Sequence, residues 1–358
     1  MSSTTPNKIL QPLLVTVVIL GCFMTIFFTY FKPSNYYWLN GQSTVSPHQV
    51  KSSISTTKNE SVITVLVWLW PFGARFALDV CSSKYNTEGC FITADRNLYK
   101  KSDAVVFHHR DIHGDLSNLP SQQRPSFQKW IWLNLESPTH SPLLPGLNTL
   151  FNLTLNYRQD SDIKATYGLI VPAETEEDFV PPKKDKLVCW IVSNWSPNHA
   201  RIKYYNELKN HIQIQLYGRA FRRYLSNEDY APIVSSCKFY LSFENSIHVD
   251  YITEKFYKPL SLGTVPVALG TTRQNYENFI QGDAFIHVDD FSSPKELAEY
   301  LLFMDKTQDM YLRFFKWRRH FKSYPYDSWA ERMCHVCVYL KLHKEYKSIN
   351  NLNKWYWG

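Results

Sequence analysis

Three short groups of polar residues in this chain have the types and spacing that catalysis requires. In the first, the apolar run 129–135 leads directly into Glu136, and Ser137 and a Pro turn follow. Ligands of αβ folds collect at the carboxyl ends of strands, so a carboxylate placed there can act as a general base toward a hydroxyl. A carboxylate that is simply hydrogen-bonded in a turn is the alternative interpretation.

The second group follows another apolar run, 187–192. Ser193 and Asn194 come at its end, and Arg201 and Lys203 follow shortly afterwards. A helix is expected to begin at this turn. Its backbone N–H groups, together with a hydroxyl, an amide and a guanidinium, suit a phosphate group. An ordinary polar cap beside a solvated arginine is the competing interpretation.

The third group lies between the apolar run 239–243 and an expected helix that opens at Thr253. A lysine in the first turn of a helix opposes the helix dipole, so Lys255 is poorly placed for stability alone. It is well placed to face an anion. Glu254 beside it can accept hydrogen bonds from ribose hydroxyls.

Alternating strand and helix patterns place these groups in two consecutive αβ units. Further strands are expected at residues 62–70, 104–109, 151–157, 212–217, 265–269 and 284–288. A helix is expected at 294–304, with Ser293 as its N-cap and Glu296 completing a capping box. A polar, proline-containing stretch at 172–186 separates the two units. The pattern predicts two Rossmann-like domains of the α/β class that face a cleft.

One apolar run, residues 9–31, contains no charged residue. At 1.5 Å per residue it spans about 30 Å, the thickness of a bilayer core. It is long for a signal peptide and lacks a small-residue cleavage site. We therefore expect a tail at 1–8, an uncleaved transmembrane anchor at 9–31 and a stem at 32–61. The formal net charge of +7 is scattered along the chain, which argues against nucleic acid as a partner.

Six cysteines follow the apolar run, an even number, and disulfides persist in secretory compartments. The Cys-x-x-Cys motif at Cys334 and Cys337 is open to zinc, redox chemistry or structural disulfides. We favour two disulfides back to the first domain, and we expect Cys189 to pair with Cys237.

Two sequons, at Asn59 and Asn152, predict N-linked glycans on the part of the chain that follows the anchor. Together with the cysteines they favour a type II topology, in which a short tail is cytosolic and the globular body is lumenal.

The order of several longer strings resembles the animal α1,3-fucosyltransferases of glycosyltransferase family 10, and the resemblance covers essentially the whole chain. These strings are Trp-Pro-Phe-Gly at 70–73, His-His-Arg-Asp at 108–111, Asn-Leu-Glu-Ser-Pro at 134–138, Tyr-Arg-Gln-Asp-Ser-Asp at 157–162, Ser-Asn at 193–194, Phe-Glu-Asn-Ser at 243–246 and Tyr-Ile-Thr-Glu-Lys at 251–255.

The resemblance implies a GT-B fold and an inverting enzyme that moves L-fucose from GDP-β-L-fucose to the 3-hydroxyl of GlcNAc. The acceptors would be Galβ1-4GlcNAc (lactosamine) chains of glycoproteins and glycolipids, and the products Lewis x-type structures. Residues 62–171 would bind the acceptor, and 187–327 would bind GDP-fucose. After the linker at 172–186 and the second domain, residues 328–358 would return to the first domain.

By motif position, Glu136 would be the catalytic base and would also contact the acceptor, together with Ala74, Arg110 and Ser137. Ala74 replaces a glutamine that is expected in the family, and Arg110 is typical of the α1,3-restricted members. The expected donor-binding residues are Tyr167, Ser193, Asn194, Arg201, Tyr240, Asn245, Tyr251, Glu254 and Lys255. The expected disulfides are Cys81–Cys334, Cys90–Cys337 and Cys189–Cys237.

The resemblance further implies a single-pass protein of the Golgi membrane. GDP-fucose would be a substrate, and no cofactor is required. A divalent metal would at most stimulate transfer, and no metal ligands are assigned. The expected partners are GDP-fucose, lactosamine-terminated glycans, the Golgi membrane and, as a candidate, a second copy of the chain. Two alternatives stay open, a glycan-binding scaffold without turnover and a fucosyltransferase with another acceptor.

Overall fold

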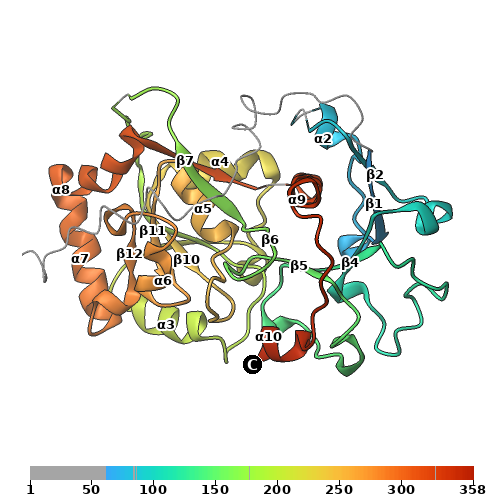
Figure 1. Ribbon diagram of the computed structural model, residues 1–358. Coiled ribbons are helices and arrows are strands. Elements are labelled where there is room, and N and C mark those ends of the chain that lie inside the picture. Colours follow the sequence, from blue (N-terminus) through green and yellow to red (C-terminus); the bar gives the residue numbers. More distant parts are fainter. Residues whose placement is uncertain (1–61, 84, 86, 177, 327) are drawn as a thin grey trace, which may run out of the picture. The chain divides into compact units, whose positions relative to one another are not determined.

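The computed structural model describes residues 62–358, apart from 84, 86, 177 and 327, and contains two parallel β-sheets (Figure 1). The first sheet has the order β2-β1-β3-β4-β5-β6, and its strands are β1 (Ile63–Leu69), β2 (Cys90–Thr93), β3 (Ala104–His108), β4 (Lys129–Asn134), β5 (Leu153–Asn156) and β6 (Ile163–Lys164). The second has the order β12-β11-β10-β8-β9, and its strands are β8 (Lys186–Ile191), β9 (Ile214–Tyr217), β10 (Cys237–Phe243), β11 (Val265–Leu269) and β12 (Ile286–His287).

Both sheets reverse their strand order at one place. In the first sheet the reversal lies between β1 and β3, and in the second it lies between β8 and β10. Ligands of open parallel sheets bind outside the carboxyl ends of the strands at such a reversal. The α/β class with parallel sheets is therefore confirmed, and the topology marks two strand edges where a site is expected.

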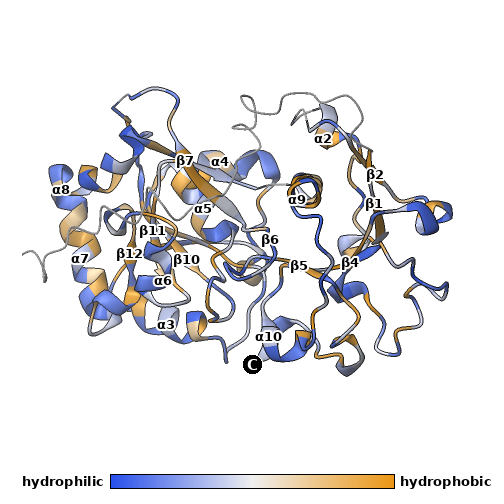
Figure 2. Ribbon diagram, viewed as in Figure 1, coloured by the Kyte–Doolittle hydropathy of each residue, from blue (hydrophilic) through white to orange (hydrophobic). Residues whose placement is uncertain are grey.

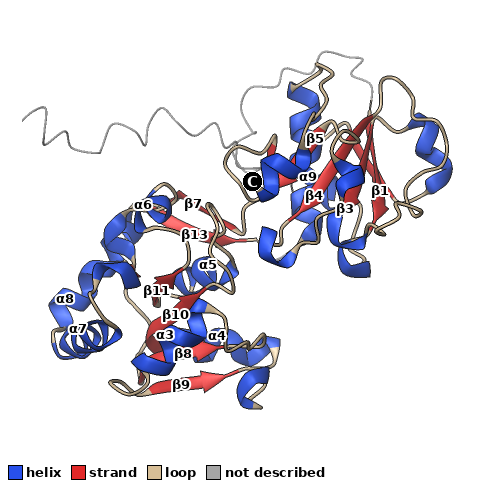
Figure 3. Cartoon of the chain, turned by 90° about the horizontal axis from the view of Figure 1, so that it is seen from below, coloured by secondary structure: helices blue, strands red, loops and turns tan. Residues whose placement is uncertain are grey.

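More helices lie around the second sheet than around the first (Figure 3). The helices are α2 (Val80–Ser83), α3 (Ala200–Leu208), α4 (Asn227–Ser235), α5 (Glu254–Ser261), α6 (Arg273–Glu277), α7 (Pro294–Lys306), α8 (Gln308–Leu312), α9 (Trp329–Leu342) and α10 (Leu352–Trp357). Most of them lie around the second sheet. Short 3-10 turns and loops make up much of the connections in the first.

The end of the chain supplies the helices that cover the first sheet. Successive strand residues alternate between two apolar clusters: Val106 packs in the cluster that contains Met333 of α9, whereas Phe107 packs in the cluster that contains Tyr356 of α10. Side chains of a strand point alternately to opposite faces, so α9 and α10 close the two faces of one sheet. Figure 2 shows hydrophobic colour along much of β1, a strand of this sheet.

A two-stranded antiparallel sheet joins segments that are far apart in the sequence. β7 (Gly168–Pro172) pairs with β13 (Phe321–Pro325), and both strands contact α5. A Cβ at Gly168 would come within 2.5 Å of the Tyr257 ring of α5, so only glycine permits this packing. The sequence analysis did not anticipate either strand.

The expected disulfides are present, and two of them tie α9 to the first domain. Cys81–Cys334 joins α2 to α9, and Cys90–Cys337 joins β2 to α9. The third bond, Cys189–Cys237, links two neighbouring strands of the second sheet, β8 and β10. The disulfide interpretation of the Cys-x-x-Cys motif is confirmed.

Two local predictions need correction. The helix expected directly after the strand at 187–192 begins only at Ala200, because Pro197 disfavours helical backbone in the residue before it. Ser293 is the N-cap of α7 as expected, but Glu296 does not complete a capping box. Its carboxylate accepts instead from the backbone N–H and hydroxyl of Ser292.

The anchor, the stem and Asn59 lie outside the described residues and stay predictions. No helix within 62–358, as far as the structure describes that range, is long and apolar enough to cross a bilayer. Asn152 is buried, and its Nδ2 donates to the Lys347 carbonyl at 2.6 Å while its Oδ1 accepts from the Trp130 N–H. The predicted glycan on Asn152 conflicts with this arrangement, because it would have to be attached to a side chain that is 1% exposed.

We predict that replacing both Cys189 and Cys237 by alanine will lower the free energy of unfolding. The two residues are 48 apart in the sequence. In the chain-entropy model, a closed loop of this length contributes about 4 kcal/mol. Guanidinium denaturation followed by tryptophan fluorescence measures the loss, and a difference under about 1 kcal/mol would contradict this estimate.

Candidate active site

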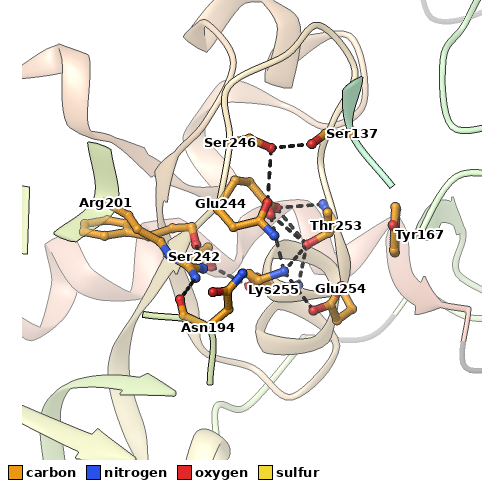
Figure 4. A network of polar contacts seen from close by, with 12 residues as sticks. Ser137, Tyr167, Asn194, Arg201, Ser242, Glu244, Ser246, Thr253, Glu254 and Lys255 are labelled. Carbon is orange, nitrogen blue, oxygen red and sulfur yellow. Dashed lines mark hydrogen bonds and ion pairs between the residues drawn. The ribbon is translucent and has the colours of Figure 1, made fainter. Parts of the chain in front are cut away.

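A polar network forms where β10 ends and α5 begins (Figure 4). Glu244 follows β10 directly and is 1% exposed. Its carboxylate accepts from the backbone N–H of Thr253 at 2.8 Å and from the hydroxyl of Thr253 at 2.9 Å. Thr253 is in turn the N-cap of α5, and its side chain accepts from the backbone N–H of Lys255. The buried carboxylate therefore fixes the residue from which α5 starts.

Lys255 lies between two carboxylates. Its Nζ is 3.4 Å from Glu244 Oε2, 3.0 Å from Glu254 Oε1 and 2.9 Å from the Thr253 hydroxyl. Partial burial alone would lower the pKa of Lys255, but the two carboxylates outweigh it and hold that pKa above its ordinary value. The ammonium group stays charged in the first turn of a helix because Glu244 and Glu254 compensate the unfavourable dipole.

Arg201, on α3, links the loop after β8 to the end of β10. Its guanidinium donates to the Asn194 carbonyl and to the Phe243 carbonyl, the latter at 3.3 Å. Arg201 is 3% exposed, and its Nε has no hydrogen-bond partner within the part of the chain that the structure describes. The positive charge of Arg201 disfavours the protonated form of Lys255 and so acts to lower its pKa. The two cations therefore lie within electrostatic reach of each other. They converge at the strand reversal of the second sheet.

The other expected donor residues lie around this cation pair. Burial raises the pKa of Tyr240 on β10, and the charge of Glu254 raises it further. Asn245 accepts from the Ser246 hydroxyl at 3.1 Å. Ser193 and Asn194 are exposed in the loop that leads to α3.

Two tyrosines extend from this network toward the first sheet. The rings of Tyr167 and Tyr251 are edge-to-face at 6.2 Å, and the Tyr167 hydroxyl donates to the Leu135 carbonyl. Burial raises the pKa of both phenols well above the ordinary value, and the charges of Glu136 and Glu254 raise each of them further. The tyrosine pair therefore lies within electrostatic reach of carboxylates from both sheets.

Glu136 follows β4 at the facing edge of the first sheet and is half-buried. Its backbone N–H donates to Asn134 Oδ1 at 3.2 Å, and its carbonyl accepts from the Tyr356 hydroxyl of α10. The next residue, Ser137, accepts a 2.7 Å hydrogen bond from Ser246, two positions after Glu244. The segments that carry the two carboxylates are thus in direct contact.

The residues expected to bind the acceptor extend along the carboxyl ends of β1, β3 and β4. Asp111 joins two of these loops: its Oδ2 accepts from the Phe72 backbone N–H at 2.8 Å and is 2.5 Å from His108 Nδ1. Arg110 donates to the His140 carbonyl and lies 6.0 Å from the Phe72 ring centre. The turn that ends at the exposed Ala74 therefore lies beside Arg110.

The sequence analysis missed the structural roles of Glu244 and Asp111. Glu244 follows an apolar strand directly, the same signal that indicates Glu136. Its negative charge, together with that of Glu254, compensates the lysine in the first turn of α5. Asp111 stands in a quoted motif, but its partners come from a different loop and from a buried histidine. Local spacing gives no sign of such contacts.

Asp160 and Asp162, from the string at 157–162, bind groups of the protein itself. Asp160 pairs with Arg158 at 2.7 Å, and Asp162 accepts from the Thr154 backbone and hydroxyl. In the described residues, no group of three or more His, Cys, Asp or Glu side chains is arranged to hold a metal ion. A separate hollow of about 550 Å³ lies beside the network, and Ala200 and Gly270 are among its lining residues.

Comparisons with known proteins agree with these motifs. A family model described as "Glycosyltransferase family 10 (fucosyltransferase) C-term" matches residues 181–355, and one described as "Fucosyltransferase, N-terminal" matches residues 60–168. The chain belongs to the family 10 fucosyltransferases. The resemblance expected from the strings is confirmed.

Family members of known name match the chain over its length. The mouse protein (Mus musculus) named 4-galactosyl-N-acetylglucosaminide 3-alpha-L-fucosyltransferase 9 is 51% identical over 358 residues, 99% of this chain and 100% of that protein. The human protein (Homo sapiens) of the same name is 50% identical over 358 residues, which again cover 99% of this chain and 100% of that protein. A human relative, 4-galactosyl-N-acetylglucosaminide 3-alpha-L-fucosyltransferase FUT6, is 42% identical over 329 residues, 90% of each chain.

The fold is also similar to a solved family structure. A protein described as "alpha1,3-Fucosyltransferase with GDP-fucose" superposes with a TM-score of 0.51 at 15% identity, over 81% of this chain and 94% of that chain. At this identity the likeness concerns the arrangement of the sheets and helices.

A buried histidine in the turn after β3 is expected to make the stability of the fold depend on pH. His109 is 0% exposed, its Nε2 is 2.9 Å from the Pro142 carbonyl, and its Nδ1 accepts from the Trp132 indole at 3.1 Å. In the neutral ring, Nε2–H can donate to the Pro142 carbonyl while Nδ1 accepts from the indole. Burial lowers the pKa of His109 from 6.5 to about 4, because the charged ring would lose its hydration. Protonation of Nδ1 would also direct an N–H at the Trp132 indole N–H.

We predict that the fold loses stability as the pH falls from 6.5 toward 4. The folded pKa of His109 is below the unfolded value, so its contribution is complete above pH 6.5 and is lost through this window. The full loss is about 3 kcal/mol. Denaturation at several pH values should show a flatter dependence for His109→Gln, and identical slopes for the two proteins would refute the assignment.

Proposed function

We propose that this protein transfers L-fucose from GDP-β-L-fucose to the 3-hydroxyl of GlcNAc in Galβ1-4GlcNAc chains, with inversion at the anomeric carbon. The supporting observation is the contact between two strand edges, one carrying Glu136 and the other carrying Lys255 and Arg201. The names of the relatives support the choice of sugar, bond and acceptor.

In the proposed reaction, the GlcNAc 3-oxygen attacks the anomeric carbon of fucose from the face opposite the diphosphate. Glu136 accepts the hydroxyl proton as the new C–O bond forms. The bond between the anomeric carbon and the β-phosphate oxygen breaks, and its electron pair leaves with GDP. The products are the α-linked fucoside, GDP and a protonated Glu136.

The two cations take the place that a general acid has in glycoside hydrolysis. The leaving diphosphate needs charge compensation rather than a proton, and Lys255 and Arg201 would supply it as negative charge grows on the β-phosphate. Because Lys255 is already held by Glu244, little reorganisation would be needed at the moment of transfer. Glu254 would accept hydrogen bonds from the ribose hydroxyls. Tyr167 and Tyr251 would contact the donor.

Proposals about location follow from the sequence alone. The apolar run at 9–31 would anchor the protein in the Golgi membrane with its tail in the cytosol. The disulfides support a lumenal body, because such bonds persist in oxidising compartments. The proposed physiological acceptors are lactosamine-terminated glycoproteins and glycolipids.

Replacing Glu136 by glutamine tests the role of the base. Glutamine keeps the size of the side chain but cannot accept the proton, so kcat should fall by roughly 100-fold to 10,000-fold. Calorimetric titration should show unchanged GDP-fucose binding. Glu299→Gln on α7 is the matched control and should retain full activity, because that side chain is 64% exposed. Wild-type kcat in Glu136→Gln would remove this residue from the mechanism.

A panel of acceptors tests the proposed linkage. Lactosamine should be fucosylated, whereas Galβ1-3GlcNAc should not, because its GlcNAc 3-oxygen already carries galactose. Product analysis by mass spectrometry and NMR reports the site and the anomeric configuration. Fucose on the 4-hydroxyl of Galβ1-3GlcNAc, or a β-linked product, would contradict the proposal.

A further inference from the structure

Arg332 on α9 is a buried cation to which the mechanism above gives no role. It is 5% exposed, and one amino group of its guanidinium donates to the Ser328 carbonyl at 3.1 Å. Its Nε is buried and has no hydrogen-bond partner among the residues that the structure describes. A buried donor without an acceptor costs free energy, which other contacts of the guanidinium have to offset.

Aromatic rings surround the guanidinium. Its central carbon lies 5.7 Å from the ring centres of both Tyr167 and Tyr326 and 5.5 Å from that of Trp329. A desolvated guanidinium over such rings makes strong cation–π contacts. Arg332 and Glu254 are also within electrostatic reach of each other. The arginine thus approaches the donor-binding network from the helix that covers the first sheet.

Tyr167 connects this arginine to both halves of the candidate site. Its hydroxyl donates to the carbonyl of Leu135, the residue before Glu136, and its ring meets that of Tyr251. A shift of the Tyr167 ring would therefore disturb the end of β4 and the donor side together. Arg332 borders this ring.

Two covalent bonds hold the arginine in place. Cys334 and Cys337 follow Arg332 on the same helix, and their disulfides attach α9 to α2 and β2. The two bonds restrain sliding of α9 along the sheet, so the backbone that carries Arg332 is held in place relative to α2 and β2.

We propose that Arg332 is a positioning residue for fucosyl transfer: its guanidinium holds the Tyr167 ring between Glu136 and Glu254. The inference rests on the proposed function, because its effect is read in the kinetics of that reaction. Arg332 acts through Tyr167, so its removal should have no consequence once the Tyr167 ring is absent.

A double-mutant cycle tests the proposal. Arg332→Met keeps the length of the side chain but removes the charge, and it should lower kcat/KM for GDP-fucose about 30-fold, the loss expected for a desolvated cation–π contact. The KM for lactosamine should change less than twofold. In a Tyr167→Leu background, Arg332→Met should cause no further loss, because coupled residues are not additive. Arg332→Lys should recover part of the activity.

Arg318→Met is the matched control. Arg318 also lies over aromatic rings, those of Phe179 and Trp317, and donates to carbonyls at the far end of α5 from Lys255. It should lower the melting temperature about as much as Arg332→Met and leave kcat/KM unchanged. Equal kinetic losses in the two variants, or additive losses in the cycle, would overturn the proposal. A wild-type protein that transfers no fucose would refute the proposed function instead.

Discussion

The candidate site depends on one buried carboxylate, that of Glu244. It accepts hydrogen bonds from the backbone N–H and the hydroxyl of Thr253, and it lies 3.4 Å from the ammonium group of Lys255. These contacts set the first residue of α5 and keep a lysine charged where the helix dipole opposes it. Without this partner, Glu254 would be left to oppose the effect of burial on Lys255, the proposed counterion of the diphosphate. Arg201 reaches the same place from α3.

The chain returns to its first sheet after it has completed the second. α9 and α10 cover opposite faces of that sheet, and two disulfides secure α9. The hydroxyl of Tyr356, on α10, donates to the Glu136 carbonyl. An element that closes the apolar core therefore also contacts the proposed base.

The sequence predicts the local features of this protein well and the long-range ones poorly. β-Branched and aromatic runs identify most of the strands, and a carboxylate at a strand end identifies Glu136. The pairing of β7 with β13 and the roles of α9 and α10 depend on partners more than 100 residues away, for which periodicity has no signal. Glu244 was recognisable by the rule that selected Glu136, but its pairing with Lys255 required the fold of an intervening loop.

A structure of the protein with GDP and a lactosamine acceptor bound together would test the central claim most directly. The account predicts one Glu136 carboxylate oxygen about 3 Å from the GlcNAc 3-oxygen, with β-phosphate oxygens about 3 Å from the Lys255 ammonium group and the Arg201 guanidinium. A diphosphate bound away from both cations, or a Glu136 carboxylate more than about 6 Å from the acceptor hydroxyl, would contradict it.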